Sequence, residues 1–348
     1  MNTITVGIIF GGVSVEHDVS LWSAKNIMTA CLDAGHDVAL IYVKRDGSWN
    51  TSEEYGQIFL SRPSNELTKH MSAALSTSVS VIPGSGFATE GKSINIDIVF
   101  PIIHGTTGED GVLQGCIEIA GIPYVGCGVT ASAIGMDKVI TKVLAENAGI
   151  PVAKYIVALK NEAPIFLDLV QKLGLPMFVK PASLGSSVGV SKVRDEEEYV
   201  QALRSAFLSD EKALIEEAIV GKEIECGILE DGGLLASGVG EVATTHEFYS
   251  YEAKYLDEKA VTITLPANIP EDIKAIVQQY SQTIAHAIGV CGLSRVDFFY
   301  SNKGEVIFNE INTLPGFTAL SMYPMLWKQE GYSHIDLLNT LVRSALKK

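Results

Sequence analysis

Residues 292–318 read GLSRVDFFYSNKGEVIFNEINTLPGFT, a stretch that predicts a β-hairpin with polar residues on one face. Two runs of apolar and aromatic residues flank a short polar segment that ends in Gly304. This pattern is typical of two strands joined by a tight turn. We expect the strands to pair in one of two registers, with Ser301 opposite Gly304 or Asn302 opposite Glu305.

Four polar side chains interrupt the apolar runs of this hairpin: Arg295 and Asp297 in the first strand, Glu310 and Asn312 in the second. Side chains two apart on a strand share a face, and both registers bring the two pairs onto the same face. Such an oxygen-rich face suits a hard cation such as Mg²⁺, with the guanidinium beside it. The alternative is a plain solvated face, which the apolar surroundings disfavour because buried charges need partners.

Composition bounds the class of protein. The 348 residues suffice for two or three domains, and a hydrophobic content of 47% with a mean hydropathy of +0.23 indicates a globular chain. The net charge of −15 argues against nucleic acid or an anionic membrane as a partner. We see no signal peptide and no apolar run of 18 residues, and the five cysteines lack metal-ligand spacing, so we expect a cytoplasmic protein.

The first part of the chain alternates strand and helix. A strand at residues 3–10, a helix at 17–34 and a further strand predict a parallel α/β sheet. Glu16 lies at the turn before this helix, either as a binding residue or as a partner of the helix dipole. A strand at residues 94–100 leads into a Gly-rich acidic loop that contains His104. Loops at the carboxyl ends of parallel strands carry function.

Other segments give coarser expectations. Residues 51–92 are polar and irregular, which favours a hairpin or loops. A strand is expected at residues 122–127 and a single helix at 131–148. The dense aromatic and charged residues of the segment 243–258 suggest a lid.

A second Gly-rich segment, ASLGSSVGV at residues 182–190, lies between two predicted strands rather than before a helix. It is therefore no Walker loop, but its amides and hydroxyls can surround a phosphate; the alternative is a flexible turn. Lys180 precedes it in an apolar strand and needs a partner such as a phosphate. Glu216 and Glu217 end a later strand, where they could bond a nucleoside or form surface charge.

Eight segments, in this order, resemble the ATP-grasp superfamily and, within it, the D-alanine–D-alanine ligase family. They are FGGVSVEHDVSLWSAKNI, HGTTGEDGVLQG, MDK, FVKPASLGSSVGVSKV, IEEAIVGKEIECGIL, FYSYEAKY, SRVDFF and NEINTLPGFT. The resemblance covers essentially the whole chain. It implies an α/β (α+β) three-domain ATP-grasp fold, with an N-terminal parallel-sheet substrate domain at residues 1–130. The central ATP-grasp subdomain would span residues 131–222, and the C-terminal one, with the metal site and the lid loop, residues 223–348.

The resemblance also implies the site residues. ATP would be bound by Lys138, Lys180, Ser187, Glu216, Ala218, Ile219, Glu223 and Phe248. Two Mg²⁺ ions, replaceable by Mn²⁺, would be held by Asp297, Glu310 and Asn312. The catalytic residues would be Glu16, Ser186, Tyr255, Arg295, Gly316 and Ser321. The D-alanine substrates would also contact His104, Lys254 and Met322.

The implied reaction joins two D-alanine molecules at the expense of ATP, through D-alanyl phosphate, and supplies peptidoglycan precursor synthesis. A homodimer is implied as well. D-Ala-D-lactate ligases have a His in place of Tyr255, and D-Ala-D-Ser ligases typically have an Arg in place of Met322, so both positions favour D-alanine as second substrate. The alternatives are those two ligases, another ATP-grasp ligase or carboxylase, and a non-enzymatic nucleotide-binding protein.

Overall fold

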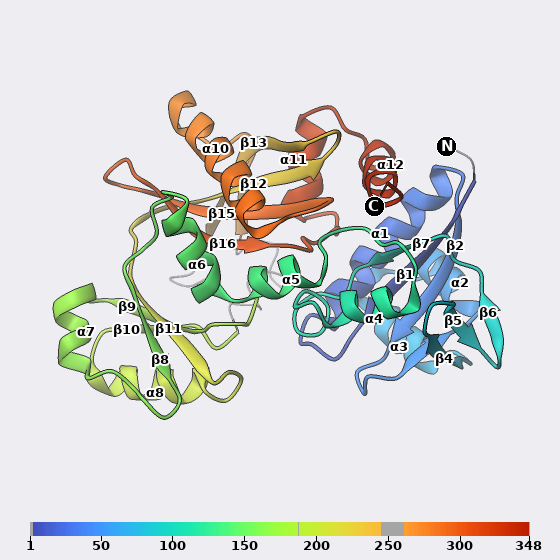
Figure 1. Cartoon of the computed structure of the whole chain (residues 1–348), viewed down its shortest axis with the longest axis horizontal. Helices are drawn as coiled ribbons and strands as arrows, with labels where there is room; N and C mark the ends of the chain where they lie inside the picture. The colour runs from blue at the N-terminus through green and yellow to red at the C-terminus, as the bar shows by residue number, and fades with distance from the viewer. Residues whose placement is uncertain (1–2, 187, 245–260, 348) are drawn as a thin grey trace.

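The computed structural model describes residues 3–186, 188–244 and 261–347. These residues form three sheets, which lie in different parts of the molecule (Figure 1). The chain forms the sheets in sequence order, one after another, and the active-site candidates come from all three regions. This agrees with the mixed α/β architecture expected from the sequence.

The N-terminal sheet has seven strands in the order β6-β5-β4-β3-β2-β1-β7. Its parallel part is β1, β2 and β7, as the strand–helix–strand pattern predicts, whereas β3 to β6 pair antiparallel. The bounds are β1 Thr5–Gly11, α1 His17–Asp33, β2 Asp37–Val43, β3 Trp49–Thr51, β4 Thr77–Ile82, β5 Gly86–Thr89, β6 Lys92–Ile94, β7 Ile98–Pro101 and α4 Val112–Ala120.

The expectation of a hairpin or loops at residues 51–92 was right for β4 and β5 but wrong for the helices before them. Two short α-helices, α2 (Glu54–Ser61) and α3 (Leu67–Ala73), and the 3₁₀ turn η1 (Ser64–Glu66) occupy this region. Each short helix buries only two residues, one turn apart: Tyr55 and Phe59 in α2, Leu67 and Met71 in α3. So few apolar positions produce little periodicity in a polar sequence.

The expected strand at residues 122–127 is not present. Its only ladder contact is an isolated bridge between Val99 and Tyr124, flanked by backbone hydrogen bonds to Val99. Pro123 cannot donate to a ladder, and Gly126 adopts a φ of +99°, so pairing cannot continue. The segment therefore crosses as an extended connection rather than a strand.

The expected single helix at residues 131–148 is two helices, α5 (Val129–Met136) and α6 (Lys138–Asn147). Asp137 between them has a non-helical ψ of 102°, and its carboxylate accepts the N–H groups of Val139 and Ile140. The N–H of Lys138 donates to the carbonyl of Ala182 at 2.9 Å. Asp137 is thus an N-cap that starts a new helix and places Lys138 at its first turn.

The remaining two sheets are antiparallel. The four-stranded sheet has the order β10-β9-β11-β8 and the five-stranded sheet the order β14-β13-β12-β15-β16. The bounds are β8 Tyr155–Leu159, α7 Phe166–Leu173, β9 Met177–Pro181, β10 Ser191–Val193, α8 Glu196–Ala206, β11 Lys212–Glu217, β12 Gly221–Glu230, β13 Leu234–Thr244, β14 Val261–Thr264, α10 Glu271–Ile288, β15 Leu293–Ser301 and β16 Val306–Asn312.

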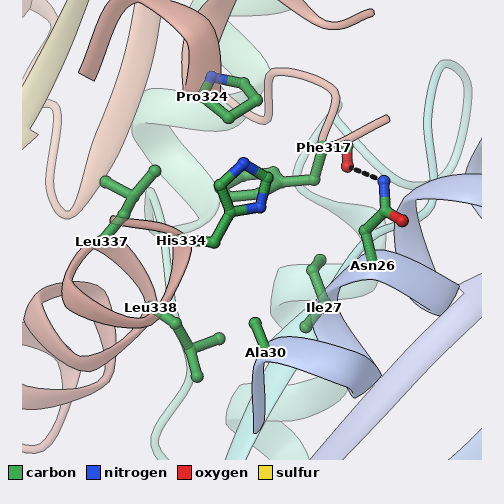
Figure 2. Close-up of a pocket in the computed structure, with 8 residues that line it drawn as sticks. All are labelled: Asn26, Ile27, Ala30, Phe317, Pro324, His334, Leu337 and Leu338. Carbon is green, nitrogen blue, oxygen red and sulfur yellow. Dashed lines mark hydrogen bonds between the residues drawn. The ribbon is translucent and has the colours of Figure 1, made fainter. Parts of the chain in front are cut away.

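The C-terminal helices α11 (Met322–Gln329) and α12 (His334–Ala345) join the end of the chain to its beginning. Apolar residues of α1, the loop after β16, and α12 form one buried cluster that includes Ile27, Phe317 and Leu338. Figure 2 shows these segments meeting around a small pocket. None of the helices described is both long and apolar enough to span a membrane.

Candidate active site

The β15–β16 hairpin carries the four polar residues on one face, but the pairing of its strands differs from the one expected from the sequence. Asp297 lies opposite Glu310 and Arg295 opposite Asn312. Near the turn the pairing is shifted, with Tyr300 opposite Val306, so neither expected turn register is right. At a β-bulge between Asp297 and Phe298 the register shifts by one residue, and this shift keeps all four side chains on the same face.

Arg295 is held firmly at this face. Its Nε and Nη2 donate to the two oxygens of Asp297, at 2.8 and 2.7 Å, and its Nε lies 3.0 Å from Glu225 Oε2. Burial alone would lower the pKa of Arg295, but Asp297 and Glu225 raise it well above its usual range. The guanidinium is therefore a fixed positive charge with a set orientation.

Lys138 joins the hairpin to the Gly-rich segment 182–190. Its Nζ lies 3.0 Å from Glu310 Oε2 and donates to the carbonyl of Leu184 at 2.7 Å. The side chain is almost fully buried. One ammonium thus contacts both the hairpin and the loop that could surround a phosphate. As predicted, this loop lies between two strands, β9 and β10, and these pair antiparallel.

Two further lysines, Lys142 and Lys180, pair with a single buried carboxylate. Glu216 at the end of β11 forms ion pairs with Lys180 of β9 and with Lys142 of α6, the latter at 2.6 Å. Lys180 also donates to Asn309 Oδ1 at 3.4 Å. Burial would raise the pKa of Glu216, but the two lysines together lower it. Sequence reasoning missed Lys142; its signal was the spacing of four residues from Lys138, which puts both on one face of α6.

Glu16 and Ser186 come together although 170 positions separate them in the sequence. The Ser186 hydroxyl donates to Glu16 Oε1. Glu16 is buried at the start of α1, and Gly105 packs so closely that an added Cβ would lie 2.8 Å from Glu16 Oε2. The main chain around His104 is tied to the same turn, because the Ser14 hydroxyl donates to the His104 carbonyl at 2.6 Å. Loop 104–111 therefore packs directly on Glu16.

The loop after β16 is bound to α1 on both sides of Phe317. The Phe317 N–H donates to Ser23 Oγ at 3.2 Å, and Asn26 Nδ2 donates to the Phe317 carbonyl at 2.8 Å, the bond drawn in Figure 2. Ser23 Oγ also lies 3.0 Å from His104 Nε2. These contacts fix the loop that contains Gly316.

Ser321 is oriented by the same loop. The Thr318 N–H donates to its Oγ at 3.0 Å, and the Thr318 hydroxyl lies 2.9 Å from it. Gly316 leaves room for this hydroxyl, because a Cβ there would lie 2.7 Å from Ser321 Oγ. Any larger residue at position 316 would therefore displace Ser321.

A cavity of about 560 Å³ brings most of these groups together. The predicted residues that line it are Glu16, His104, Lys138, Ser186, Arg295, Glu310, Asn312, Gly316, Ser321 and Met322. Lys180 and Glu216 do not line it but lie next to it through Asn309, the neighbour of Glu310. Such a cavity is large enough for a small polar substrate and part of a nucleotide.

Other predicted residues fall elsewhere. Ser187, Phe248, Lys254 and Tyr255 lie outside the described residues. Ala218 and Ile219 form the connection between β11 and β12, and Glu223 lies on β12 opposite Phe299. The contribution of these positions to binding stays a prediction.

The carboxylate and amide oxygens of the hairpin are the ligands that a hard divalent cation prefers. Glu310 and Asp297 offer carboxylate oxygens, and Asn312 Oδ1 accepts the Leu314 N–H at 2.8 Å while keeping a second lone pair. Within the described ranges, no group of three or more His, Cys, Asp or Glu side chains has a metal-binding arrangement. Of the three expected metal ligands, only Asp297 and Glu310 belong to these residue types, and the third ligand would be the amide oxygen of Asn312.

Two family models match the chain. The one described as D-ala D-ala ligase N-terminus matches residues 5–127, and the one described as D-ala D-ala ligase C-terminus matches residues 144–343. D-alanine–D-alanine ligase of Oceanobacillus iheyensis is 43% identical, over 99% of this chain and 95% of the relative. D-alanine–D-alanine ligase A of Escherichia coli K12 is 42% identical, over 100% and 97%.

Solved structures are similar over the same extent. The D-alanine–D-alanine ligase from Coxiella burnetii superposes with a TM-score of 0.87 at 32% identity, covering 100% of this chain and 95% of that one. The VanG D-Ala:D-Ser ligase from Enterococcus faecalis superposes with a TM-score of 0.86 at 34% identity, covering 99% and 100%. The three-sheet architecture is thus that of the ATP-grasp ligases, as the sequence predicted.

Proposed function

Since the chain belongs to the D-alanine–D-alanine ligase family, we propose that it joins two molecules of D-alanine and converts ATP to ADP and phosphate. It is a ligase. The observation that carries the proposal is the hairpin face, where Arg295 and Glu310 line one cavity with Lys138 and with the Glu16–Ser186 pair. A carboxylate activated with ATP needs cations at one end of the site and a substrate clamp at the other.

In the first step a carboxylate oxygen of one D-alanine attacks the γ-phosphorus of ATP, and ADP leaves. A carboxylate is a poor electrophile, and the acyl phosphate that forms is a good one. Lys138 and Lys180 would contact the phosphates and offset the charge that gathers during transfer. Glu16, held by Ser186, would bind the ammonium of this D-alanine.

In the second step the amine of the other D-alanine attacks the acyl carbon. The tetrahedral adduct carries an oxyanion and then expels phosphate, leaving the new amide bond. Arg295 and the Gly316 N–H would donate to the oxyanion, an effect that in other enzymes is worth roughly 3–4 kcal/mol per donor. Ser321 would bind the carboxylate of the second substrate, beside His104.

Asp297, Glu310 and Asn312 are the residues that would hold two Mg²⁺ ions. When bound, these ions would neutralise the phosphate oxygens and polarise the transferred group. Asp297 is oriented for this role by its two bonds from Arg295, and Glu310 by Lys138. A single charged network thus sets both the ligands and the oxyanion donor.

The nucleotide base would lie at the end of β11. Glu216, the backbone at Ala218 and Ile219, and Glu223 would contact adenine and ribose. Ser187, Phe248, Lys254 and Tyr255 belong to the same proposal and would complete the phosphate loop and the lid. A closed lid protects the acyl phosphate from water.

Biological context forms part of the proposal. We place the enzyme in the cytoplasm, as a homodimer that supplies a dipeptide for peptidoglycan synthesis. The five cysteines are free, which suits a reducing compartment. The net charge of −15 argues against nucleic acid or an anionic membrane as a partner.

The second substrate could instead be D-serine, since a D-Ala:D-Ser ligase is among the similar structures. Met322 argues against this, because it contributes an apolar side chain to the cavity instead of a hydrogen-bond donor. The test is a competition of D-alanine, D-serine and D-lactate for D-alanyl phosphate across pH 6–9, with products resolved by mass. We expect D-Ala-D-Ala to dominate; a majority of depsipeptide or of D-Ala-D-Ser would overturn the assignment.

A further inference from the structure

Lys142 is a buried cation with no part in the reaction described above. Its side chain is 1% exposed, and its Nζ lies 2.6 Å from Glu216 Oε1. Glu216 Oε2 is paired with Lys180. Each oxygen of one buried carboxylate is therefore held by a lysine from a different element.

One lysine would suffice to neutralise Glu216. Burial lowers the pKa of Lys142 and the neighbouring Lys180 lowers it further, while Glu216 opposes the shift. If Lys142 served only to stabilise the fold, its buried ammonium would be unfavourable, because buried charges without a full set of counter-charges are destabilising. A structural role would be met equally well by an apolar side chain of the same length.

The charges around α6 indicate which kind of ligand the ammonium of Lys142 favours. Lys138, Lys142 and Lys180 contact only two carboxylates within the described chain, Glu216 and Glu310. Lys138 and Lys142 are one turn apart on α6, so a single helix aims one lysine at each carboxylate. The surplus positive charge lies where a polyphosphate is proposed to bind.

We propose that Lys142 is a positioning residue for ATP, which holds Glu216 in place and, through it, sets Lys180 for the nucleotide. Lys142 itself touches neither substrate; it acts through Glu216. The negative charge that completes the cluster is that of the nucleotide phosphates. This inference rests on the proposed function, because it needs ATP bound beside Lys180.

The test is Lys142→Met in the full-length enzyme, with steady-state kinetics for ATP and for D-alanine. Methionine retains the unbranched side chain as far as Cε and leaves Glu216 paired one-to-one with Lys180, so the variant is expected to fold. We expect the KM for ATP to rise about tenfold, as for the loss of one charge-assisted hydrogen bond, while kcat and the KM for D-alanine stay within about twofold. Lys160→Met, which removes an exposed pair with Glu211, is the matched control and should behave as wild type.

A double variant separates positioning from a merely structural role. In the Glu216→Gln background, Lys142→Met should change the KM for ATP by less than about twofold, because its route of action is already lost. A lower melting temperature with an unchanged KM for ATP, or an additive effect in the double variant, would overturn the inference. If Lys142→Met does not fold, Lys142→Gln is measured instead against the same criteria. Failure of the wild type to release ADP with D-alanine would count against the proposed function, not against Lys142.

Discussion

Asp297 and Glu310 lie directly opposite each other on β15 and β16 because β16 contains one extra residue, Asn309, at a β-bulge. Beyond the bulge, Phe298 pairs with Phe308, and both rings are buried in the core. Without it, the register set at the turn would put Glu310 on the core face. A one-residue irregularity therefore decides which face of the sheet carries the carboxylate.

Glu310→Gln tests this carboxylate. The amide keeps the size of the side chain but removes the charge that faces Lys138 and would hold a cation. We expect D-alanine-dependent ADP release to fall by roughly 10²-fold or more. Glu305→Gln, an exposed glutamate on the same hairpin, is the control and should retain full activity. Unchanged ADP formation by Glu310→Gln would refute the metal assignment.

Gly105→Ala tests the packing of loop 104–111 on Glu16. Gly105 has a φ of +73°, and its added Cβ would lie 2.8 Å from Glu16 Oε2. Gly91 has a φ of +75° and nothing within 4 Å, so Gly91→Ala has the same backbone strain without the collision. We expect both variants to lose about 1 kcal/mol of unfolding free energy. Only Gly105→Ala should raise the KM for D-alanine, by about tenfold; equal KM values in the two variants would contradict the role of Glu16.

Local sequence patterns predicted the long elements of the N-terminal sheet but not the register of the β15–β16 hairpin. The strand expected at residues 3–10 and the helix expected at 17–34 are present as β1 and α1, with ends within two residues of the predicted ones, since each has a strong apolar pattern. The patterns failed where a single side chain overrides periodicity. Asp137 splits an apolar helix by capping the second half, and Pro123 prevents a strand that its apolar neighbours favour.

The candidate site was predictable in its residue types but not in its connections. Charged residues in apolar strands pointed to Lys180 and Glu310, and the resemblance to the ligase family implied Lys138. It could not show that Lys138 contacts Glu310, since 172 positions separate them and only the packing of α6 near β16 brings them together. Lys142 was missed for the same reason, because its partner Glu216 lies on β11, far along the sequence from α6.

Asn26→Ala tests the link between α1 and the loop that contains Gly316. The substitution removes the 2.8 Å bond to the Phe317 carbonyl, next to the proposed oxyanion donor. A neutral hydrogen bond is worth about 0.5–1.5 kcal/mol, so we expect kcat to fall about three- to tenfold. The KM for ATP is the internal control and should not change, because the proposed nucleotide site lies elsewhere. A change confined to the KM for ATP would argue against this link.

Glu216 makes the stability of the protein depend on pH in a defined direction. Its pKa in the folded protein is lower than the usual 4.5, because Lys180 and Lys142 outweigh the effect of burial. The stabilisation is therefore fully present above pH 4.5 and is lost as the pH falls through the folded-state pKa. The difference in unfolding free energy between wild type and Glu216→Gln should be constant from pH 7 to 5 and shrink below that. A difference that grows in acid would show that the lysines do not stabilise the carboxylate.

We propose that the enzyme joins two D-alanine molecules with conversion of ATP to ADP. The most direct measurement is ADP release with D-alanine as the sole amino acid, with the product identified by mass. We predict ADP, phosphate and D-Ala-D-Ala in equal amounts, and no ADP above background without D-alanine. ADP release that requires bicarbonate, or that proceeds without formation of the dipeptide, would contradict the assignment as a D-alanine–D-alanine ligase.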